Sequence, residues 1–301
     1  MATLRDVKRK IQAVKKTQKI TKAMNMVAAS KLKGAQEKME AFWPYADKIA
    51  QVLARLIEHT AIEEEHVHPF LISRKVENVD LLLMTSDRGL CGSFNASLIA
   101  KAEGFIKEKS AKGITVCLTC IGRKGRDYFH HKKYNIRSSH VGIVGGRFGF
   151  NAAVTLGKGL IESFLNGETD EAYVIFSKFV SMTRYVPTLK QLLPMGRIEK
   201  FDKSHGDEEA DYVAEYICEP SAKALMAEIL PKCVYAQLFR ALLETSTSEH
   251  AARAQAMDKA TTNCADMINS LTLVFNKARQ AAITKELMDI VGGAEALRGS
   301  W

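Results

Sequence analysis

The stretch LRDVKRKIQAVKKTQKITKAMNMVAASKL, residues 4–32, carries mostly apolar or small side chains at a regular spacing of seven residues. This spacing is that of the a and d positions of a heptad repeat, which predicts a helix packed lengthwise against a partner helix. At 1.5 Å per residue the helix is roughly 80 Å long. Pro44 predicts a kink or a local break in it. The two series are Leu4, Ile11, Gln18, Asn25, Leu32, Met39, Ala46 and Leu53, and Val7, Val14, Thr21, Ala28, Ala35, Phe42, Ile49 and Leu56.

A second long helix is predicted at the other end of the chain. Residues 234–297 contain no Pro, and their only Gly residues are Gly292 and Gly293. Pro220 and Pro231 are well placed to start helices, and the predicted helix reaches roughly 95 Å. The expected heptad is interrupted by a one-residue skip, which locally relaxes a supercoil. Its positions are Leu238, Leu242, Thr245, Glu249, Ala252 and Ala256, then Ala260, Cys264, Met267, Leu271, Val274 and Ala278.

The middle of the chain has a different period. Apolar runs of strand length occur at residues 79–85, 114–122 and 172–180, and helical patterns occupy residues 95–109 and 151–165. Strands that alternate with helices indicate a mainly parallel sheet. The first long helix enters this domain and the second leaves it. The two helices are therefore predicted to run antiparallel, with both chain termini at the distant tip.

The predicted fold class is α/β, with a long antiparallel coiled coil of N- and C-terminal helices and a central Rossmann-like α/β domain. Its three expected segments are residues 1–60, the N-terminal helix, residues 61–219, the α/β domain, and residues 220–301, the C-terminal helix.

Polar residues in the seam of the coiled coil are predicted to fix its register, the best-attested use of a polar a position. The expected register starts from Leu56 lying level with Val234. Equal rise per residue then places Asn25 near Ala265, within one helical turn. The predicted register residues are Gln18, Thr21 and Asn25.

Composition limits the possible partners. The chain has 301 residues, 47% hydrophobic and 26% charged, which is typical of a globular protein with a sizeable core. Its formal net charge of +9 favours an acidic partner, which leaves nucleic acid, anionic lipid and an acidic protein surface open. No run approaches the roughly 20 apolar residues of a membrane span.

The six cysteines are scattered, and the one close pair is Cys117 and Cys120, within an apolar run. Because a strand misaligns two residues at this spacing, we expect buried free thiols rather than zinc or redox chemistry. The expected compartment is a reducing one.

One motif resembles a phosphate-binding turn. TSDRGLCGSFN, residues 85–95, follows an apolar strand, contains Gly89 and Gly92, and leads into a helical pattern. It lacks both the third Gly of the dinucleotide fingerprint and the Gly-Lys-Ser/Thr of a P-loop. We therefore expect a tight strand-to-helix turn, with the glycines at positive φ and the side chains of Ser86 and Asp87 accepting from backbone N–H groups.

Three further polar or glycine-rich stretches carry no recognisable chemistry. The residues from His130 to Lys133 are expected to form a solvated turn, residues 142–150 a flexible connector, and residues 63–68 a polar linker. No arrangement of Ser, His and Asp or of Cys and His can be assembled. No catalytic residue, metal site or cofactor site is predicted.

Three stretches together identify a family. ITKAMNMVAASKL near the start, SDRGLCGSFN in the middle and residues 248–297 near the end resemble the γ subunits of F-type ATP synthases, in the same order and over almost the whole chain. The resemblance implies a non-catalytic rotor. Its coiled coil stands inside a hexamer of α and β subunits, and its α/β domain sits with the ε subunit on the membrane ring of c subunits.

The resemblance also implies which residues face the stator. A shaft that turns against successive, similar surfaces is served by shallow polar contacts, and basic residues of the first helix would meet an acidic loop of the β subunits. Met24 falls in that segment, and three residues of the second helix fall where family members hydrogen-bond a catalytic subunit. The tip, residues 288–297, would turn in an apolar collar. The predicted stator contacts are Lys8, Arg9, Lys19, Lys22, Met24, Arg279, Gln280 and Thr284.

Two other classes of function stay open at this point. A basic coiled coil could bind nucleic acid or act as a scaffold, and a dinucleotide-dependent enzyme would use the turn at residues 85–95. The expectation is neither nucleic acid nor cofactor, and membrane contact only through the complex. Because Met1 directly precedes the first helix, we expect a peripheral protein at the cytoplasmic face of a bacterial inner membrane rather than on the mitochondrial matrix side.

Overall fold

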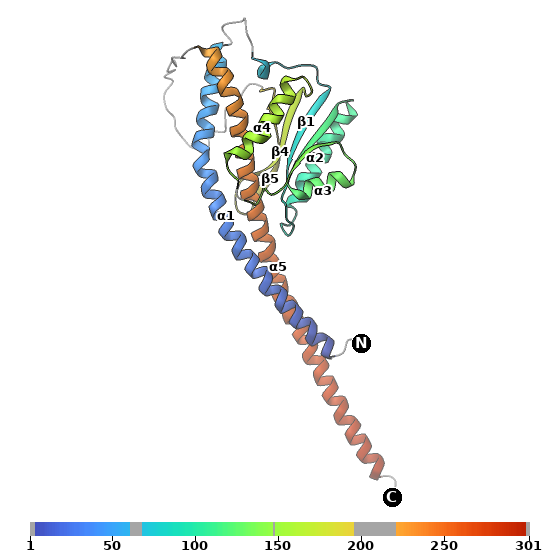
Figure 1. The fold of residues 1–301 in the computed structure, drawn as a ribbon. Coiled ribbons are helices and arrows are strands. Elements are labelled where there is room, and N and C mark those ends of the chain that lie inside the picture. The colour runs from blue at the N-terminus through green and yellow to red at the C-terminus, as the bar shows by residue number, and fades with distance from the viewer. Residues whose placement is uncertain (1–3, 61–67, 147, 196–220, 299–301) are drawn as a thin grey trace. The chain divides into compact units, whose positions relative to one another are not determined.

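The computed structural model describes residues 4–60, 68–146, 148–195 and 221–298 (Figure 1). Two helices account for the ends of the chain: α1, Leu4–Thr60, with 57 residues, and α5, Ala222–Arg298, with 77 residues. Between them lie a short 3₁₀ helix and an alternation of strands and helices. The fold class predicted from the sequence is confirmed.

The chain divides into two compact units, and both long helices pass through both. Met1–Ala28 and Arg253–Trp301 make up one, called here the coiled-coil unit, and Ala29–Ala252 make up the other, called the α/β unit. The division into residues 1–60, 61–219 and 220–301 follows the chain rather than compactness, and it stays a prediction.

The α/β unit is built on a five-stranded sheet with the order β3-β2-β1-β4-β5. The first four strands are mutually parallel, and β5 is antiparallel to β4. A parallel pair needs a crossover, and the helices α2, α3 and α4 supply these connections. The elements in chain order are η1 (Pro69–Leu71), β1 (Asn78–Met84), α2 (Phe94–Ala111), β2 (Thr115–Ile121), α3 (Arg123–His131), β3 (Ile136–His140), α4 (Phe150–Leu165), β4 (Glu171–Phe179) and β5 (Tyr185–Leu193).

Each face of the sheet has its own hydrophobic core, as the alternation along β1 shows. Leu81 and Leu83 pack with residues of α2 and α3, whereas Leu82 and Met84 pack with residues of α4, α1 and α5. Figure 1 shows α2 and α3 together on one side of the sheet and α4 on the other. The long helices thus serve as part of the cover of one sheet face.

The sequence located three of the five strands and two of the three crossover helices. β3, with the sequence IRSSH, was missed because an edge strand that is half exposed along its length has no apolar run. β5 contains Pro187, which a central strand would not tolerate and an edge strand does. α3 is only nine residues long and mostly polar, which hid it from a search for helical periodicity.

The heptad of α1 is confirmed. Every predicted a and d position from Leu4 to Leu56 is buried or half-buried, with Leu32, Met39 and Leu53 at 3% exposure or less. Pro44 does not end the helix. It lies on the exposed side, as does Glu40, whose carbonyl loses its intrahelical partner there and remains open to water.

Pro231, one of the two prolines expected to start helices, lies inside α5 instead. The helix begins at Ala222, and the backbone N–H of Ala224 donates to Ser221 Oγ at 3.2 Å, as in an N-cap. The two turns added before Pro231 bring Met226 and Leu230 into the core that also contains Leu56.

Candidate functional site: the coiled-coil unit

The seam of the coiled-coil unit follows an unbroken heptad on both helices. On α1 the least exposed residue of each turn is the predicted one, and Val7, Thr21 and Ala28 are buried. On α5 the predicted positions Met267 and Val274 are wrong, since both are about half exposed, at 49% and 51%. No skip occurs in this part of α5. The observed seam positions are Ala254, Met257, Thr261, Cys264, Ile268, Leu271, Phe275 and Ala278.

Two side-chain contacts define the register. Thr21 Oγ1 lies 2.7 Å from Thr261 Oγ1, and Asn25 Nδ2 donates to Asp258 Oδ1 at 3.2 Å. The helices are therefore antiparallel. The predicted register is wrong by seven residues, because Asn25 meets Asp258 rather than Ala265. That offset is about 10 Å along the axis.

The register error has a physical origin. Leu56 was assumed to lie level with Val234, whereas it packs in a cluster that also includes Met226 and Leu230, earlier in α5. Polar contacts of Thr21 and Asn25 across the seam support their predicted role in register. That role, and the role of the half-buried Gln18, stay predictions.

A disulfide scan tests the register. With Cys264 replaced by Ser, the pair Thr21→Cys and Thr261→Cys should cross-link in most chains under mild oxidation, because the two oxygens that the sulfurs replace lie 2.7 Å apart. The pair Asn25→Cys and Ala265→Cys should stay mostly reduced. Non-reducing gel electrophoresis measures both yields, and equal yields would contradict the observed register.

Charge in this unit is concentrated on α1. Residues 4–28 carry eight Lys and Arg against the single Asp6, and the unit as a whole holds +8 of the chain's +9 formal charge. All eight side chains are exposed, and no salt bridge found among the described residues involves them. Lys8, Lys15 and Lys22 recur every seven residues and so lie along one flank. The eight are Arg5, Lys8, Arg9, Lys10, Lys15, Lys16, Lys19 and Lys22.

The predicted contact residues fall on exposed or half-exposed positions. Lys8, Arg9, Lys19 and Lys22 are exposed, and Met24 is half-exposed beside the seam. The sequence therefore placed these side chains where a partner could reach them.

The predicted contacts on α5 lie beyond the last seam residue. Arg279, Gln280 and Thr284 are exposed, and the hydroxyl of Thr284 donates to the backbone carbonyl of Gln280 at 3.0 Å. The amide side chain of Gln280 projects from an exposed part of the helix. Whether these residues meet a stator stays a prediction.

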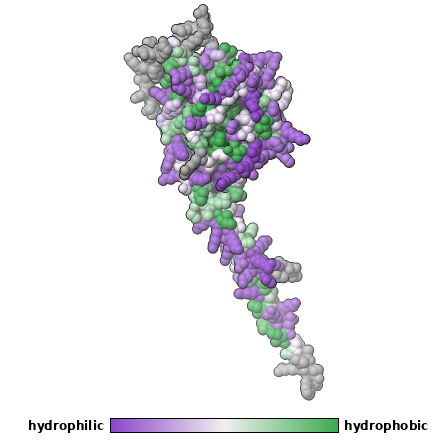
Figure 2. All heavy atoms as spheres, viewed as in Figure 1, coloured by the Kyte–Doolittle hydropathy of each residue, from purple (hydrophilic) through white to green (hydrophobic). Residues whose placement is uncertain are grey.

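The end of α5 presents apolar side chains to solvent. Leu287, Met288 and Ile290 are exposed at 56%, 68% and 68%, although an ordinary soluble helix buries such residues. Figure 2 shows hydrophilic side chains over much of the visible face of the coiled-coil unit, with hydrophobic ones gathered toward its end. An apolar helix end of this kind indicates a partner.

The turn at residues 85–95 uses its polar groups internally. Asp87 accepts from the backbone N–H groups of Arg123 and Gly142, at 3.0 and 2.9 Å, and Thr85 Oγ1 accepts from Gly125 at 2.9 Å. These bonds tie the turn to the start of α3 and to the loop after β3. The turn leads from β1 into α2, as expected, and the side chain of Asp87 accepts from backbone N–H groups, as predicted.

The details of this turn differ in part from the expectation. Gly92 has positive φ, as predicted, but the second such residue is Leu90, at φ 64°, rather than Gly89. Ser86 donates its hydroxyl to the carbonyl of Arg88, and its own N–H donates to Asn95 Oδ1 at 3.0 Å. Asn95, which the sequence did not single out, thus organises the turn.

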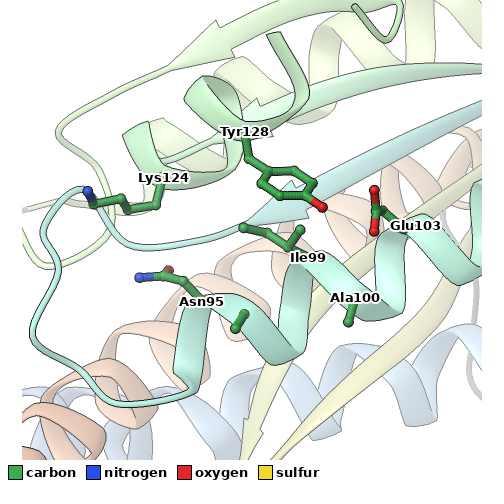
Figure 3. A pocket seen from close by; sticks show the side chains of 7 residues that line it. Asn95, Ile99, Ala100, Glu103, Lys124 and Tyr128 are labelled. Carbon is green, nitrogen blue, oxygen red and sulfur yellow. The ribbon is translucent and has the colours of Figure 1, made fainter. Parts of the chain in front are cut away.

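A groove of about 370 Å³ between α2 and α3 is the next candidate (Figure 3). Figure 3 shows Ile99 and Glu103 of α2 on the side of Tyr128 of α3, with Lys124 of α3 further along the groove. A hydrogen bond from Lys132 lowers the pKa of Glu103, so this carboxylate is engaged in an ion pair. The groove lacks a nucleophile with an adjacent base, and no acid–base chemistry follows from it.

The prediction of buried free thiols holds for Cys120, whereas Cys117 is half-exposed. Cys117 and Cys120 are both free, and burial raises the pKa of Cys120 to about 12, which keeps it a neutral thiol. Cys218 lies outside the described residues. Within the part of the chain that the structure describes, no group of three His, Cys, Asp or Glu side chains is arranged to hold a metal ion.

The remaining stretches that the sequence singled out have structural settings. His130 and His131 are exposed in the last turn of α3. Residues 63–67 lie outside the described residues. The glycine-rich stretch connects β3 to α4 and contributes Val144, 2% exposed, to the core, so it packs rather than only connects. Among the described helices, none is long and apolar enough to cross a lipid bilayer.

Comparison with known proteins gives consistent results. A family model described as ATP synthase matches residues 3–297. The chain is 54% identical over 301 residues to the ATP synthase gamma chain of Desulfosudis oleivorans, and 51% identical over 299 residues to that of Syntrophobacter fumaroxidans. Both alignments cover 99% of this chain and 100% of the relative.

Solved structures share the fold. A chain of the Euglena gracilis mitochondrial ATP synthase, in a structure of its OSCP, F1 and c-ring, superimposes with a TM-score of 0.64 at 16% identity, covering 98% of this chain and 95% of that one. A chain from the central stalk and c-ring of the Tetrahymena thermophila enzyme gives 0.60 at 24% identity, covering 80% and 99%.

Proposed function

Because the chain belongs to the ATP synthase gamma chain family, we propose that it is the central rotor shaft of an F-type ATP synthase. The shaft couples proton-driven rotation of the membrane c-ring to ATP synthesis or hydrolysis at a hexamer of alpha and beta subunits. The observation that carries this proposal is an antiparallel helix pair with an exposed basic flank and an exposed apolar end. A nucleic-acid-binding or scaffold role has no comparable support, since the related proteins are ATP synthase gamma chains.

The basic residues of α1 suit a surface that must slide past several similar partners. Exposed ion pairs are worth roughly 1 kcal/mol or less each, so a contact with one beta subunit is readily exchanged for the next. Lys8, Arg9, Lys19 and Lys22 are exposed on this helix and would meet acidic residues, with Met24 beside them. A deep apolar anchor at the same place would hold the shaft at one angle.

Coupling requires that the shaft contact the conformations of the beta subunits unequally. A ligand or partner that binds two states equally shifts no population between them. The two sides of the helix pair differ in charge and apolar character, so each orientation of the shaft presents a different surface to a given beta subunit. Rotation would then bias that subunit among open and closed states.

The proposed role of this chain is to transmit rotation, not to take part in the chemical step. It is a component of the ATP synthase complex, and we propose that all catalytic groups reside in the other subunits. The proposed partners of the α/β unit are the epsilon subunit and the c-ring. The proposed location is peripheral, at the cytoplasmic face of a bacterial inner membrane.

Replacing Gln280 and Thr284 together by Ala is expected to lower coupling while assembly is retained. Both side chains are exposed, so the fold loses little, whereas contacts to a catalytic subunit would be lost. ATP-driven proton pumping in membrane vesicles, divided by ATP hydrolysis in the same vesicles, is expected to fall about threefold or more, equivalent to roughly 0.7 kcal/mol of coupling.

Thr272→Ala is the matched control. Its hydroxyl is exposed and bonds back to the carbonyl of Ile268 at 2.7 Å, in the same way that Thr284 bonds to Gln280. The control should pump normally. Unchanged pumping in the double variant would remove Gln280 and Thr284 from the proposed stator contacts.

A further inference from the structure

Beyond the end of β1, the neighbouring edge of β4 in the α/β unit is covered by a helix. The parallel ladder between β1 and β4 runs as far as Leu83 opposite Ile175, and β1 ends at Met84, whereas β4 continues to Phe179. On its other side β4 pairs with β5, where Ser177 lies opposite Pro187, which has no N–H to donate. Neither backbone group of Ser177 bonds to β5, and both point to the side that β1 has left.

Helix α5 provides those partners with two hydroxyl groups one turn apart. The N–H of Ser177 donates to Thr245 Oγ1 at 3.3 Å, and Ser248 Oγ donates to the carbonyl of Ser177 at 3.1 Å. Thr245 and Ser248 are fully buried. The backbone of Phe179, two residues along the strand, adds a hydrogen bond to the carboxylate of Glu244.

The two long helices are held in the α/β unit in different ways. Every side chain of α5 from residue 241 to residue 252 is buried, whereas α1 buries only a stripe. The contacts of α1 include apolar ones such as Phe42 on Phe150, at 6.3 Å between ring centroids, and the packing of Leu53 in the core. Apolar packing is non-directional, but a hydrogen bond specifies direction as well as distance.

We infer that Thr245 and Ser248 are positioning residues, which set the rotational angle of α5 about its own axis against the sheet of the α/β unit. The inference rests on the proposed rotor function. α5 continues from Ala252 to Arg253 without a break in the helix, so a rotation imposed on the sheet passes directly along it. Without the two hydroxyls the helix keeps its apolar packing but loses its directional attachment to β4.

The test uses the assembled ATP synthase in membrane vesicles. Thr245→Val with Ser248→Ala removes both hydroxyls at nearly constant volume. We expect ATP hydrolysis within about twofold of the wild type and a ratio of proton pumping to hydrolysis lowered at least threefold. Thr245→Ser, which keeps a hydroxyl, should pump as the wild type does.

Thr247→Val is the matched control, because Thr247 is equally buried but its hydroxyl bonds within α5, to the carbonyl of Leu243 at 2.9 Å. A double variant that pumps with the same ratio as Thr247→Val overturns the inference. If the double variant does not assemble, the two single variants are measured instead: a lowered ratio in either supports the inference, and ratios equal to the control in both overturn it.

Failure of the proposed function gives a different result. Vesicles with the wild-type chain would then show no coupled pumping that depends on this subunit. Coupled pumping by the wild type, together with unchanged pumping by the double variant, rejects the role of Thr245 and Ser248 alone.

Discussion

Gly122→Ala is expected to lower the free energy of unfolding by about 3–5 kcal/mol. Gly122 is the N-cap of α3 and has φ +99°, a backbone conformation that residues with a side chain rarely adopt. A Cβ built there would lie 2.1 Å from the carbonyl oxygen of Thr85, and this neighbour is backbone that cannot move aside. Urea unfolding of the purified chain, followed by circular dichroism, measures the loss.

Gly113→Ala separates the two causes of that loss. Gly113 also has positive φ, +75°, but a Cβ at this position would meet nothing within 4 Å. Its expected cost is about 1–2 kcal/mol, from backbone strain alone. If both variants lost the same stability, the close approach between Gly122 and Thr85 would have no energetic consequence.

Arg137→Ala is expected to cost about 3 kcal/mol at pH 8, because it leaves the carboxylate of Asp80 without its cation. Asp80 is 4% exposed, and its Oδ2 lies 3.1 Å from Arg137 Nη1 and accepts from Thr169 Oγ1 at 2.9 Å. Removing one partner of a buried pair is costly since the remaining charge is poorly solvated.

The cost of Arg137→Ala should depend on pH in a definite direction. Burial raises the pKa of Asp80, and Arg137 partly opposes that rise, so the variant has a still higher pKa. A carboxyl whose folded-state pKa exceeds its unfolded value is most stabilising in the protonated state, and this contribution is lost as pH rises through the folded-state pKa. The loss should therefore shrink as pH falls from 8 toward 5.

Urea midpoints at pH 5, 6.5 and 8 measure this dependence. Arg126→Ala is the control, since Arg126 pairs with Asp127 at the surface and should cost about 1 kcal/mol or less. A loss for Arg137→Ala that does not change with pH would show that Asp80 is not the group responsible.

The sequence predicted α1 more accurately than α5, and the reason lies in their surroundings. α1 buries one stripe of side chains, so the spacing of its apolar residues shows which face is buried. α5 is buried on every side between residues 241 and 252, and then carries two competing apolar stripes, of which the one with Met267 and Val274 is exposed. The spacing of apolar residues shows which face of a helix is buried only where a single face is buried.

Register and local attachments were less accessible to sequence. The pairing of Asn25 with Asp258 differs by seven residues from the predicted one, because nothing in the sequence fixes the pair from which the register was counted, Leu56 and Val234. Thr245 was predicted only as a heptad position, and the sequence did not single out Ser248. Their hydrogen bonds to Ser177 depend on β4 extending beyond the end of β1, which the sequence did not predict.

The candidate contact residues came from family resemblance rather than from physical pattern. Exposed lysines on α1 are common to many helices, and nothing in their spacing specifies a stator. The structure adds that they are exposed and form no salt bridge with other described residues.

The unequal lengths of β1 and β4 also bear on solubility. Unpaired backbone N–H and C=O groups at the end of a strand can pair with a strand of another molecule. Such pairing leads to aggregation. With the hydroxyls of Thr245 and Ser248 seated on Ser177, its backbone groups are closed to foreign strands. The same side chains that anchor the helix thus also cover this edge of the sheet.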